Sequence, residues 1–165
     1  DVGGGSGIYS IGFAAANPDL QADVFDLKRV TEITQRHIES AGLSERVKTI
    51  VGDYDEDDLG TGYDLVLLSS ILHQNSIDEN RALLKKCFHA LNPGGVIIIR
   101  DFILNEDKTG PKHAALFSIN MLVATEAGAA FTANEYSAWL LEAGFKNIKR
   151  ISIEEQTELI TAATG

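Results

Sequence analysis

Asp1-Val2-Gly3-Gly4-Gly5-Ser6-Gly7 opens the chain and decides its fold. Asp1-Val2 is typical of the end of a buried strand, and the apolar run 8–16 is typical of a helix. Glycines allow positive φ and let a ligand lie against bare backbone. The N–H groups at a helix N-terminus favour an anionic group. The stretch therefore predicts a strand, a glycine turn and a helix that bind a carboxylate or phosphate. The alternative is a tight turn without a ligand.

The spacing of the glycines narrows the class of ligand. Gly3, Gly5 and Gly7 follow an acid in the pattern D-x-G-x-G-x-G, and position 8 is Ile. No register of the loop gives G-x-G-x-x-G, the dinucleotide fingerprint, so the spacing argues against a nicotinamide oxidoreductase. An acid before G-x-G-x-G resembles motif I of the class I S-adenosylmethionine (SAM)-dependent methyltransferases.

Composition excludes several classes of protein. A chain of 165 residues with a 44% hydrophobic share fits one globular domain, 1–165, with its own core. The net charge of −10 argues against a nucleic-acid partner and disfavours an anionic membrane surface. We find no signal-peptide pattern and no apolar run approaching about 18 residues. A single cysteine excludes an internal disulfide, which fits a cytoplasmic location.

The chain has no initiator Met and begins at the end of a strand, so that the first strand is truncated. We therefore expect a fragment of a longer protein, or the ordered part of one.

Strand and helix patterns alternate after the loop. Strands are predicted at 21–26, 47–51, 63–70, 96–101, 145–153 and 157–163, and helices at 30–41, after Ser76, at 111–125 and after Thr132. The helices after Ser76 and after Thr132 begin with S-x-x-E and T-x-x-E capping boxes. Cys87 falls on the apolar stripe of the helix after Ser76. Such alternation predicts a doubly wound α/β sheet. The short link 154–156 forces the last two strands to be antiparallel.

Acids stand at the ends of several predicted strands. Asp26 lies 19 residues beyond Gly7, close to the spacing at which an acid reaches a ribose, although it could instead cap the next helix. Asp53 could accept from an adenine amino group or cap the acidic turn 55–58. Because ligands of doubly wound sheets bind at the carboxyl ends of strands, the loop, Asp26, Asp53, His73 and Asp101 predict one site.

Together these residues resemble the class I methyltransferase fold, a Rossmann-like, mostly parallel, seven-stranded sheet of order 3-2-1-4-5-7-6. More narrowly, the chain resembles the catalytic domain of the caffeic acid and hydroxyindole O-methyltransferase family, including its bacterial members. The motifs that carry this resemblance are the glycine loop, Phe25-Asp26-Leu27, Gly52-Asp53, His73 after strand four, the L-x-P-G-G turn 91–95, and Asp101 followed by Ile103-Leu104.

The resemblance implies roles for individual residues. The loop would hold the methionine moiety of SAM, Asp26 the ribose, and Asp53 with Tyr54 the adenine. The implied cofactor-binding set is Asp1, Gly3, Gly5, Gly7, Asp26, Leu27, Gly52, Asp53, Tyr54 and Ser69. His73 would be the general base and Asp101 would orient it, with no metal. Phe117, Asn120 and Met121 would contact the acceptor.

Three positions depart from the family pattern. His73-Gln74-Asn75 stands where the family usually has His-Asp-Trp, Ala130 stands where a second acid is expected, and Ser69 stands where plant members have Lys. Members also carry an N-terminal helical dimerisation domain, which is absent here, so we expect a homodimer only for the full-length protein.

The expected function is methyl transfer from SAM to a hydroxyl of a small aromatic molecule in secondary metabolism, leaving S-adenosylhomocysteine (SAH). One alternative is C- or N-methylation of a small molecule such as a tetrapyrrole. Another is a SAM-binding domain without catalysis. His73 could instead only cap the next helix, and His113 is the second candidate base.

Overall fold

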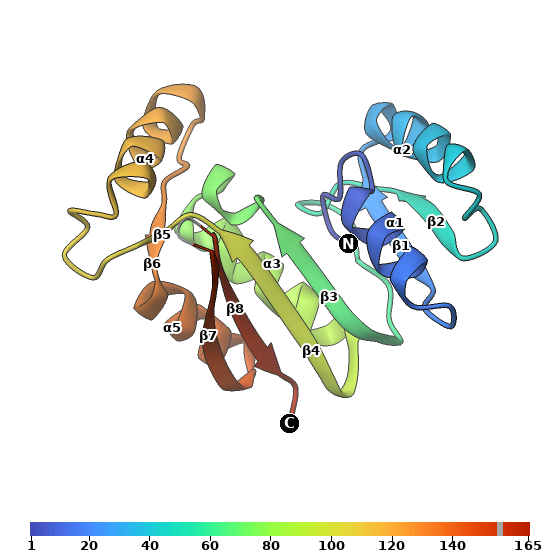
Figure 1. Ribbon diagram of the computed structural model, residues 1–165. Helices are drawn as coiled ribbons and strands as arrows, with labels where there is room; N and C mark the ends of the chain where they lie inside the picture. The colour runs from blue at the N-terminus through green and yellow to red at the C-terminus, as the bar shows by residue number, and fades with distance from the viewer. Residues whose placement is uncertain (155–156) are drawn as a thin grey trace. The chain divides into compact units, whose positions relative to one another are not determined.

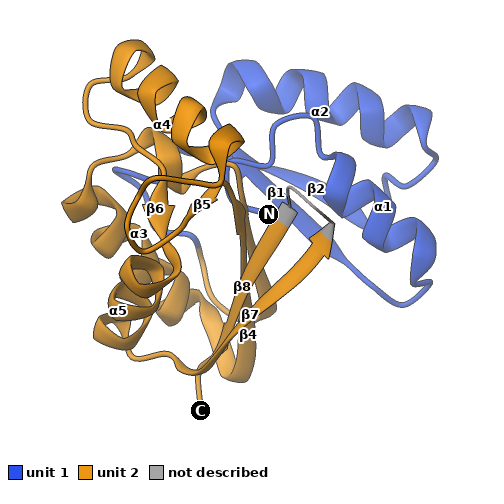
Figure 2. Cartoon of the chain, turned by 60° about the vertical axis from the view of Figure 1, so that its left-hand side comes forward, with its two compact units in different colours: residues 1–59 blue, residues 60–165 orange. Residues whose placement is uncertain are grey.

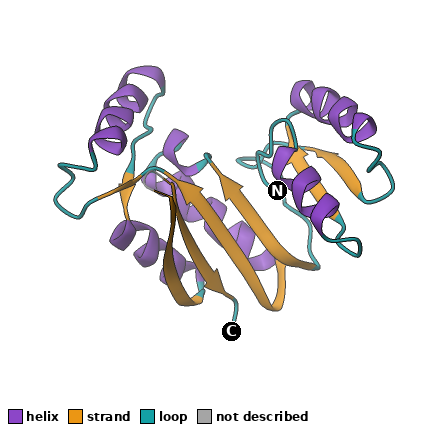
Figure 3. Cartoon of the chain, in the orientation of Figure 1, coloured by secondary structure: helices purple, strands orange, loops and turns teal. Residues whose placement is uncertain are grey.

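The chain forms two compact units in a computed structural model that describes residues 1–154 and 157–165. Unit 1 is Asp1–Leu59 and unit 2 is Gly60–Gly165 (Figure 2). Helices and strands alternate along each unit (Figure 3), as the sequence pattern predicts for an α/β fold. Each unit is described by itself.

Unit 1 holds a small parallel sheet with two helices. Its elements are α1 (Ile8–Ala16), β1 (Ala22–Asp26), α2 (Lys28–Ser40) and β2 (Val47–Val51). β1 pairs in parallel with β2, and Val2 forms a parallel bridge to Phe25 on the other side of β1. This arrangement is the 3-2-1 part of the predicted order. The two helices and two strands share one buried cluster of Ala14, Val24, Ile38 and Val47.

Helix α2 begins two residues earlier than predicted. Val30 N and Thr31 N both donate to Leu27 O, so the first helical turn already closes on Leu27. Leu27 is the N-cap and receives no help from its side chain. The start of a helix is recognised in a sequence by an N-cap Ser, Thr, Asp or Asn, whose side-chain oxygen accepts from the backbone. Leu27 has no such oxygen, so the sequence did not indicate where α2 begins.

Unit 2 holds a four-stranded mixed sheet. Its elements are β3 (Tyr63–Ser69), η1 (Leu72–Gln74), α3 (Ile77–Ala90), β4 (Leu91–Asp101), β5 (Ile103–Leu104), α4 (Lys112–Ala124), β6 (Phe131–Thr132), α5 (Ala133–Ala143), β7 (Lys146–Glu154) and β8 (Thr157–Ala163). The order is β3-β4-β8-β7, with β8 lying between β4 and β7 (Figure 1). β3 and β4 are parallel, whereas β8 is antiparallel to both neighbours, as predicted. This order is the 4-5-7-6 part of the expected sheet. Residues 155–156 of the predicted link lie outside the described residues.

Two strand features were not predicted. β4 starts at Leu91 instead of Val96, because Leu91 already pairs with Tyr63 of β3. The next pair is Leu65 with Val96, and the residues between Leu91 and Val96, which include Pro-Gly-Gly, form an irregularity in the strand. β5 and β6 form a separate two-stranded parallel sheet. Two-residue strands have no periodicity, so only the tertiary structure reveals them.

The ends of the helices follow the sequence closely. Ser76 with Glu79 and Thr132 with Glu135 form the two predicted capping boxes. Gly144 ends α5 with a φ of 106°, in the left-handed region that favours glycine. Cys87 is buried in α3, as predicted. His37 in α2 and His89 in α3 are both exposed.

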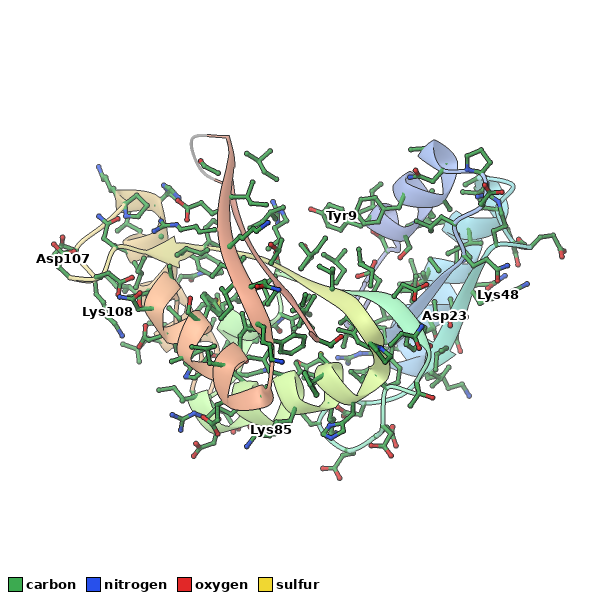
Figure 4. The ribbon with its side chains drawn as sticks, turned by 90° about the horizontal axis from the view of Figure 1, so that it is seen from below. Tyr9, Asp23, Lys48, Lys85, Asp107 and Lys108 are labelled. Carbon is green, nitrogen blue, oxygen red and sulfur yellow. The ribbon has the colours of Figure 1, made fainter. Side chains whose placement is uncertain are left out.

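Helices α3 and α5 pack against each other and against the four-stranded sheet. Lys85 of α3 pairs with Glu142 of α5 at 3.2 Å, and Figure 4 shows the Lys85 side chain at the surface of the unit. An exposed ion pair of this kind contributes at most about 1 kcal/mol. The helix–helix contact therefore depends on buried apolar side chains such as Leu83, Leu84 and Leu140.

Helix α4 is apolar on more than one face, as its sequence indicates. Ala114 and Met121 are buried, whereas Leu116, Ile119, Leu122 and Val123 are exposed. No helix in the described residues is both long enough and apolar enough to span a lipid bilayer.

Candidate functional site

The glycine loop adopts the conformation that its spacing predicts. Gly3, Gly5 and Gly7 have φ values of 63°, 56° and 75°, which L side chains rarely adopt. The turn closes through Gly7 N, which donates to Gly4 O at 2.9 Å. Ser10, in the first turns of α1, donates from Oγ to Asp1 Oδ2 at 2.9 Å. The acid before the glycines is thus tied to the helix after them.

Asp26 lies directly against this loop. Gly5 N donates to Asp26 Oδ2 at 2.8 Å, and Leu27 N donates to Asp26 Oδ1 at 2.7 Å. The structure therefore brings together the loop and the acid that the sequence places 19 residues after Gly7. The alternative that Asp26 serves as the helix cap is wrong, because Leu27 is the N-cap. Each carboxylate oxygen has a second lone pair, so Asp26 can still accept from a hydroxyl group.

The predicted Gly52-Asp53 segment follows β2. Gly52 N donates to Asp26 O at 3.1 Å, and a Cβ at Gly52 would overlap the Phe25 ring. Asp53 Oδ1 accepts from Asp55 N at 3.0 Å, so Asp53 caps the acidic turn, as the alternative interpretation expects. Its role toward an adenine stays a prediction. Tyr54 is half-buried beside it.

Helix α2 supports the loop through two side chains that the sequence analysis did not select. Thr34 Oγ1 lies 2.5 Å from Gly5 O, and His37 Nδ1 lies 3.1 Å from Ser6 O. The sequence signal available for Thr34 is its place on the buried stripe of α2, together with Ile38. A polar residue on such a stripe needs a hydrogen-bond partner.

His73 and Asp101 form a buried pair in unit 2. His73 Nδ1 lies 2.7 Å from Asp101 Oδ1, and the exposed fractions of the two residues are 7% and 5%. Asp101 also accepts from His73 N at 3.3 Å and from Phe102 N at 2.8 Å. A carboxylate that faces three donors is an acceptor only, so Nδ1 carries the proton of the neutral imidazole. His73 Nε2 is then left with its lone pair and can accept a proton. The prediction that Asp101 reaches His73 is confirmed.

Two aromatic rings lie beside the His73 imidazole. The Phe117 ring meets it edge-on, with centroids 4.7 Å apart at 89°. Phe102 stacks on Phe117 with centroids 4.0 Å apart. The structure thus places Phe117, predicted as an acceptor contact, directly beside His73, and adds Phe102. Met121 is buried and Asn120 is exposed on α4. An apolar, ring-lined surface of this kind suits a planar aromatic molecule.

The short helix η1 that carries His73 is fixed by its surroundings. Asn80 Nδ2 donates to Leu72 O at 2.9 Å. A Cβ at Gly128 would overlap His73 O, so the chain after α4 packs tightly under η1. The alternative that His73 only caps α3 is wrong, because Ser76 is the capping residue.

Two other predicted positions lie in unit 2. Ser69 is the half-buried last residue of β3, paired with Arg100 of β4. Ala130, at the position of the expected second acid, is buried at 2% exposure. Within residues 1–154 and 157–165, no group of three or more His, Cys, Asp or Glu side chains could hold a metal ion.

Comparison with known proteins places the chain in a family. A sequence model described as the O-methyltransferase domain matches residues 1–146. The chain is 40% identical over 151 residues to a 3-hydroxy-5-methyl-1-naphthoate 3-O-methyltransferase of Streptomyces sahachiroi, covering 92% of this chain and 44% of that protein. It is 36% identical over 146 residues to an L-tyrosine C(3)-methyltransferase of Streptomyces lavendulae, covering 88% of this chain and 40% of that protein.

The fold agrees with these matches. Human N-acetylserotonin methyltransferase in complex with SAM is similar in structure, with a TM-score of 0.90 and 30% identity, covering 100% of this chain and 46% of that one. The chain thus spans less than half the length of these relatives. Since the family model covers well over half of the 165 residues, the chain belongs to the O-methyltransferase domain family of the caffeic acid and hydroxyindole type.

Proposed function

We propose that this chain is the catalytic part of a SAM-dependent O-methyltransferase that methylates a hydroxyl group of a small aromatic molecule. One observation carries the proposal: His73 Nδ1 lies 2.7 Å from Asp101 Oδ1 beside the aromatic rings of Phe117 and Phe102, and this contact would leave Nε2 to accept a proton. The named relatives act on a naphthoate and on tyrosine, both of which carry an aromatic ring.

Unit 1 would hold the cofactor. The glycine loop would bind the methionine moiety of SAM, and Asp26, which already anchors the loop, would accept from the ribose hydroxyls. Asp53 and Tyr54 would flank the adenine. The remaining proposed contacts are Asp1, Leu27, Gly52 and Ser69. When bound, SAM supplies an electrophilic methyl group on a sulfonium.

His73 would remove the proton of the acceptor hydroxyl. A phenol ordinarily titrates near 10 and an imidazole near 6.5, so complete deprotonation before transfer would cost roughly 5 kcal/mol. We therefore propose that proton removal is concerted with methyl transfer. His73 Nε2 would take the proton of the acceptor hydroxyl, and bound SAM would supply the methyl group to the oxygen and leave as SAH. Asp101, hydrogen-bonded to Nδ1, then offsets the positive charge on the imidazole.

A tritiated-methyl assay of the complete protein with a panel of phenols tests the proposal. His73→Ala should lower turnover by about 10²- to 10⁴-fold, the usual contribution of a positioned base, and leave the SAH affinity unchanged. His113→Ala, which removes the second candidate base, is the matched control and should keep its turnover. Unchanged turnover in His73→Ala would reject the role of His73 as base.

A C-methyltransferase is the second candidate. Two observations favour it: a relative named as an L-tyrosine C(3)-methyltransferase, and the buried Ala130 at the position of the expected acid. The product separates the two, because O-methylation removes a titratable phenol whereas C-methylation keeps it. A SAM-binding domain without catalysis would bind SAH and label no acceptor.

Calorimetric titration with NAD and with SAM tests the alternative of a nicotinamide oxidoreductase, which would bind NAD instead of SAM.

The arrangement of the whole protein is also a proposal. We propose the order 3-2-1-4-5-7-6 for the sheet, with 1–165 as one catalytic domain, supported by the partial orders of unit 1 and unit 2. We further propose that the full-length protein is a cytoplasmic homodimer. Light scattering on the full-length protein measures its oligomeric state.

A further inference from the structure

Thr34 connects the second turn of α2 to the glycine loop. Its side chain is fully buried, and Oγ1 lies 2.5 Å from Gly5 O and 3.0 Å from Val30 O of its own helix. Close by, His37 Nδ1 lies 3.1 Å from Ser6 O. Two successive carbonyl groups of the loop are therefore turned toward α2.

This orientation fixes where the N–H groups of the loop point. In a trans peptide the N–H is antiparallel to the C=O of the same peptide unit. The only cis peptide in the described residues is Gly110-Pro111, so the loop peptides are trans. Because Gly5 O points to Thr34, the N–H of Ser6 points away from α2. Gly5 N is held in turn by Asp26 Oδ2 at 2.8 Å.

The contact also requires glycine at position 7. A Cβ at Gly7 would lie 2.8 Å from Thr34 Cγ2, which is closer than real Cβ atoms approach. Glycine at position 7 therefore has two roles. It adopts a φ of 75°, and it lets α2 come close enough for Thr34 to reach Gly5 O.

We propose that Thr34 is a positioning residue for cofactor binding. Its hydroxyl holds the Gly5 carbonyl toward α2, and the Ser6 N–H on the other side of the loop is thereby preset for the carboxylate of the methionine moiety of SAM. Thr34 itself touches no ligand. The inference rests on the proposed function, because it assumes that the loop binds this moiety.

The test compares three variants by calorimetry with two ligands. Thr34→Val keeps the shape of the side chain and removes the hydroxyl, whereas Thr34→Ser keeps the hydroxyl. Thr31→Val is the matched control, because Thr31 is buried on the same helix and its Oγ1 bonds only to Lys28 O among the contacts seen. SAH carries the amino-acid carboxylate. Methylthioadenosine is the corresponding nucleoside without it.

We expect Thr34→Val to weaken SAH binding about tenfold, the effect of one buried hydrogen bond. Methylthioadenosine binding should stay within about twofold of the wild-type value, Thr34→Ser should restore SAH binding, and Thr31→Val should leave it unchanged. Should Thr34→Val not fold, as judged by circular dichroism, the comparison of Thr34→Ala with Thr34→Ser decides in the same way.

Two results would overturn the inference alone: wild-type SAH affinity in Thr34→Val, or an equal loss for SAH and methylthioadenosine. If the wild-type complete protein binds neither SAM nor SAH, the proposed function fails first and the inference fails with it.

Discussion

Asp101 faces three hydrogen-bond donors, and this arrangement selects the tautomer of the His73 imidazole. Two come from backbone N–H groups, of His73 and Phe102, and the third is the imidazole of His73. With the carboxylate acting only as an acceptor, the imidazole must present its N–H to Asp101 and its lone pair elsewhere. A single buried carboxylate thus decides which nitrogen of His73 is available for chemistry.

Asp101→Asn tests this assignment. The amide keeps the size of the side chain but places an N–H₂ group toward one of the three donors, so one hydrogen bond is lost and the tautomer of His73 is no longer fixed. We expect turnover to fall by about 10- to 100-fold, the range for a hydrogen bond to a charged group. SAH affinity, measured by calorimetry, should stay at the wild-type value. A variant with full turnover would show that Asp101 does not orient the base.

Cys87 gives a prediction for stability against pH. Burial raises the pKa of the Cys87 thiol to about 12 from an ordinary value of 9.0. The unfolded thiol therefore ionises at a lower pH than the folded one, so its stabilising contribution is complete below about pH 9 and is lost as the pH rises toward 12. Urea unfolding should show a smaller fall in the free energy of unfolding between about pH 8 and 10.5 for Cys87→Ala than for the wild type. Equal falls would contradict this.

At the scale of elements, the turn between α4 and β6 is the support of η1. Thr125 caps the end of α4 by donating from Oγ1 to Met121 O at 2.8 Å, and the same oxygen accepts from Gly128 N at 2.8 Å. Gly128 then lies under the backbone of His73. The position of His73 therefore depends on a segment more than 50 residues further along the chain.

Gly128→Ala should displace η1. A Cβ there would overlap both His73 O and Thr125 Oγ1, and overpacking of this kind costs about 1–3 kcal/mol. We expect turnover to fall about tenfold while SAH affinity is kept. Gly12→Ala is the control, since a Cβ at Gly12 meets nothing within 4 Å and the helix gains propensity. It should raise the melting temperature and leave turnover unchanged. Wild-type turnover in Gly128→Ala would show that η1 tolerates the shift.

At the scale of the whole molecule, charge separates the possible partners. The sequence has 24 acidic and 14 Lys and Arg residues, giving a net charge of −10 at pH 7 and a pI near 4.7. Phosphate-tracking proteins need the opposite balance, because they displace counterions with clustered Lys and Arg.

We therefore expect no binding to duplex DNA in a fluorescence anisotropy titration, even at about 50 mM salt, where such binding is strongest. Solubility should pass through a minimum near pH 4.7, because the net charge vanishes there. Binding to DNA that weakens with added salt would contradict the assignment of a small-molecule acceptor.

The sequence by itself determined the longer helices and strands and the carboxyl ends of the parallel strands. Local signals in the sequence are the glycine spacing of the loop, the capping boxes at Ser76 and Thr132, and Gly144 at the end of α5. Each of them depends only on residues that are near neighbours in the chain. The positions of Asp26, His73 and Asp101 could be predicted for the same reason. The carboxyl end of a parallel strand is defined by the strand itself.

Only the tertiary structure decided which of these residues meet. Thr34 and Gly5 are 29 residues apart and His73 and Asp101 are 28 apart, so their contacts depend on strand register and on how closely the helices pack. The Phe102–Phe117 stack and the place of Gly128 beneath His73 likewise have no local pattern. Periodicity specifies which face of an element is buried. The partner on that face follows only from the packing of the folded chain.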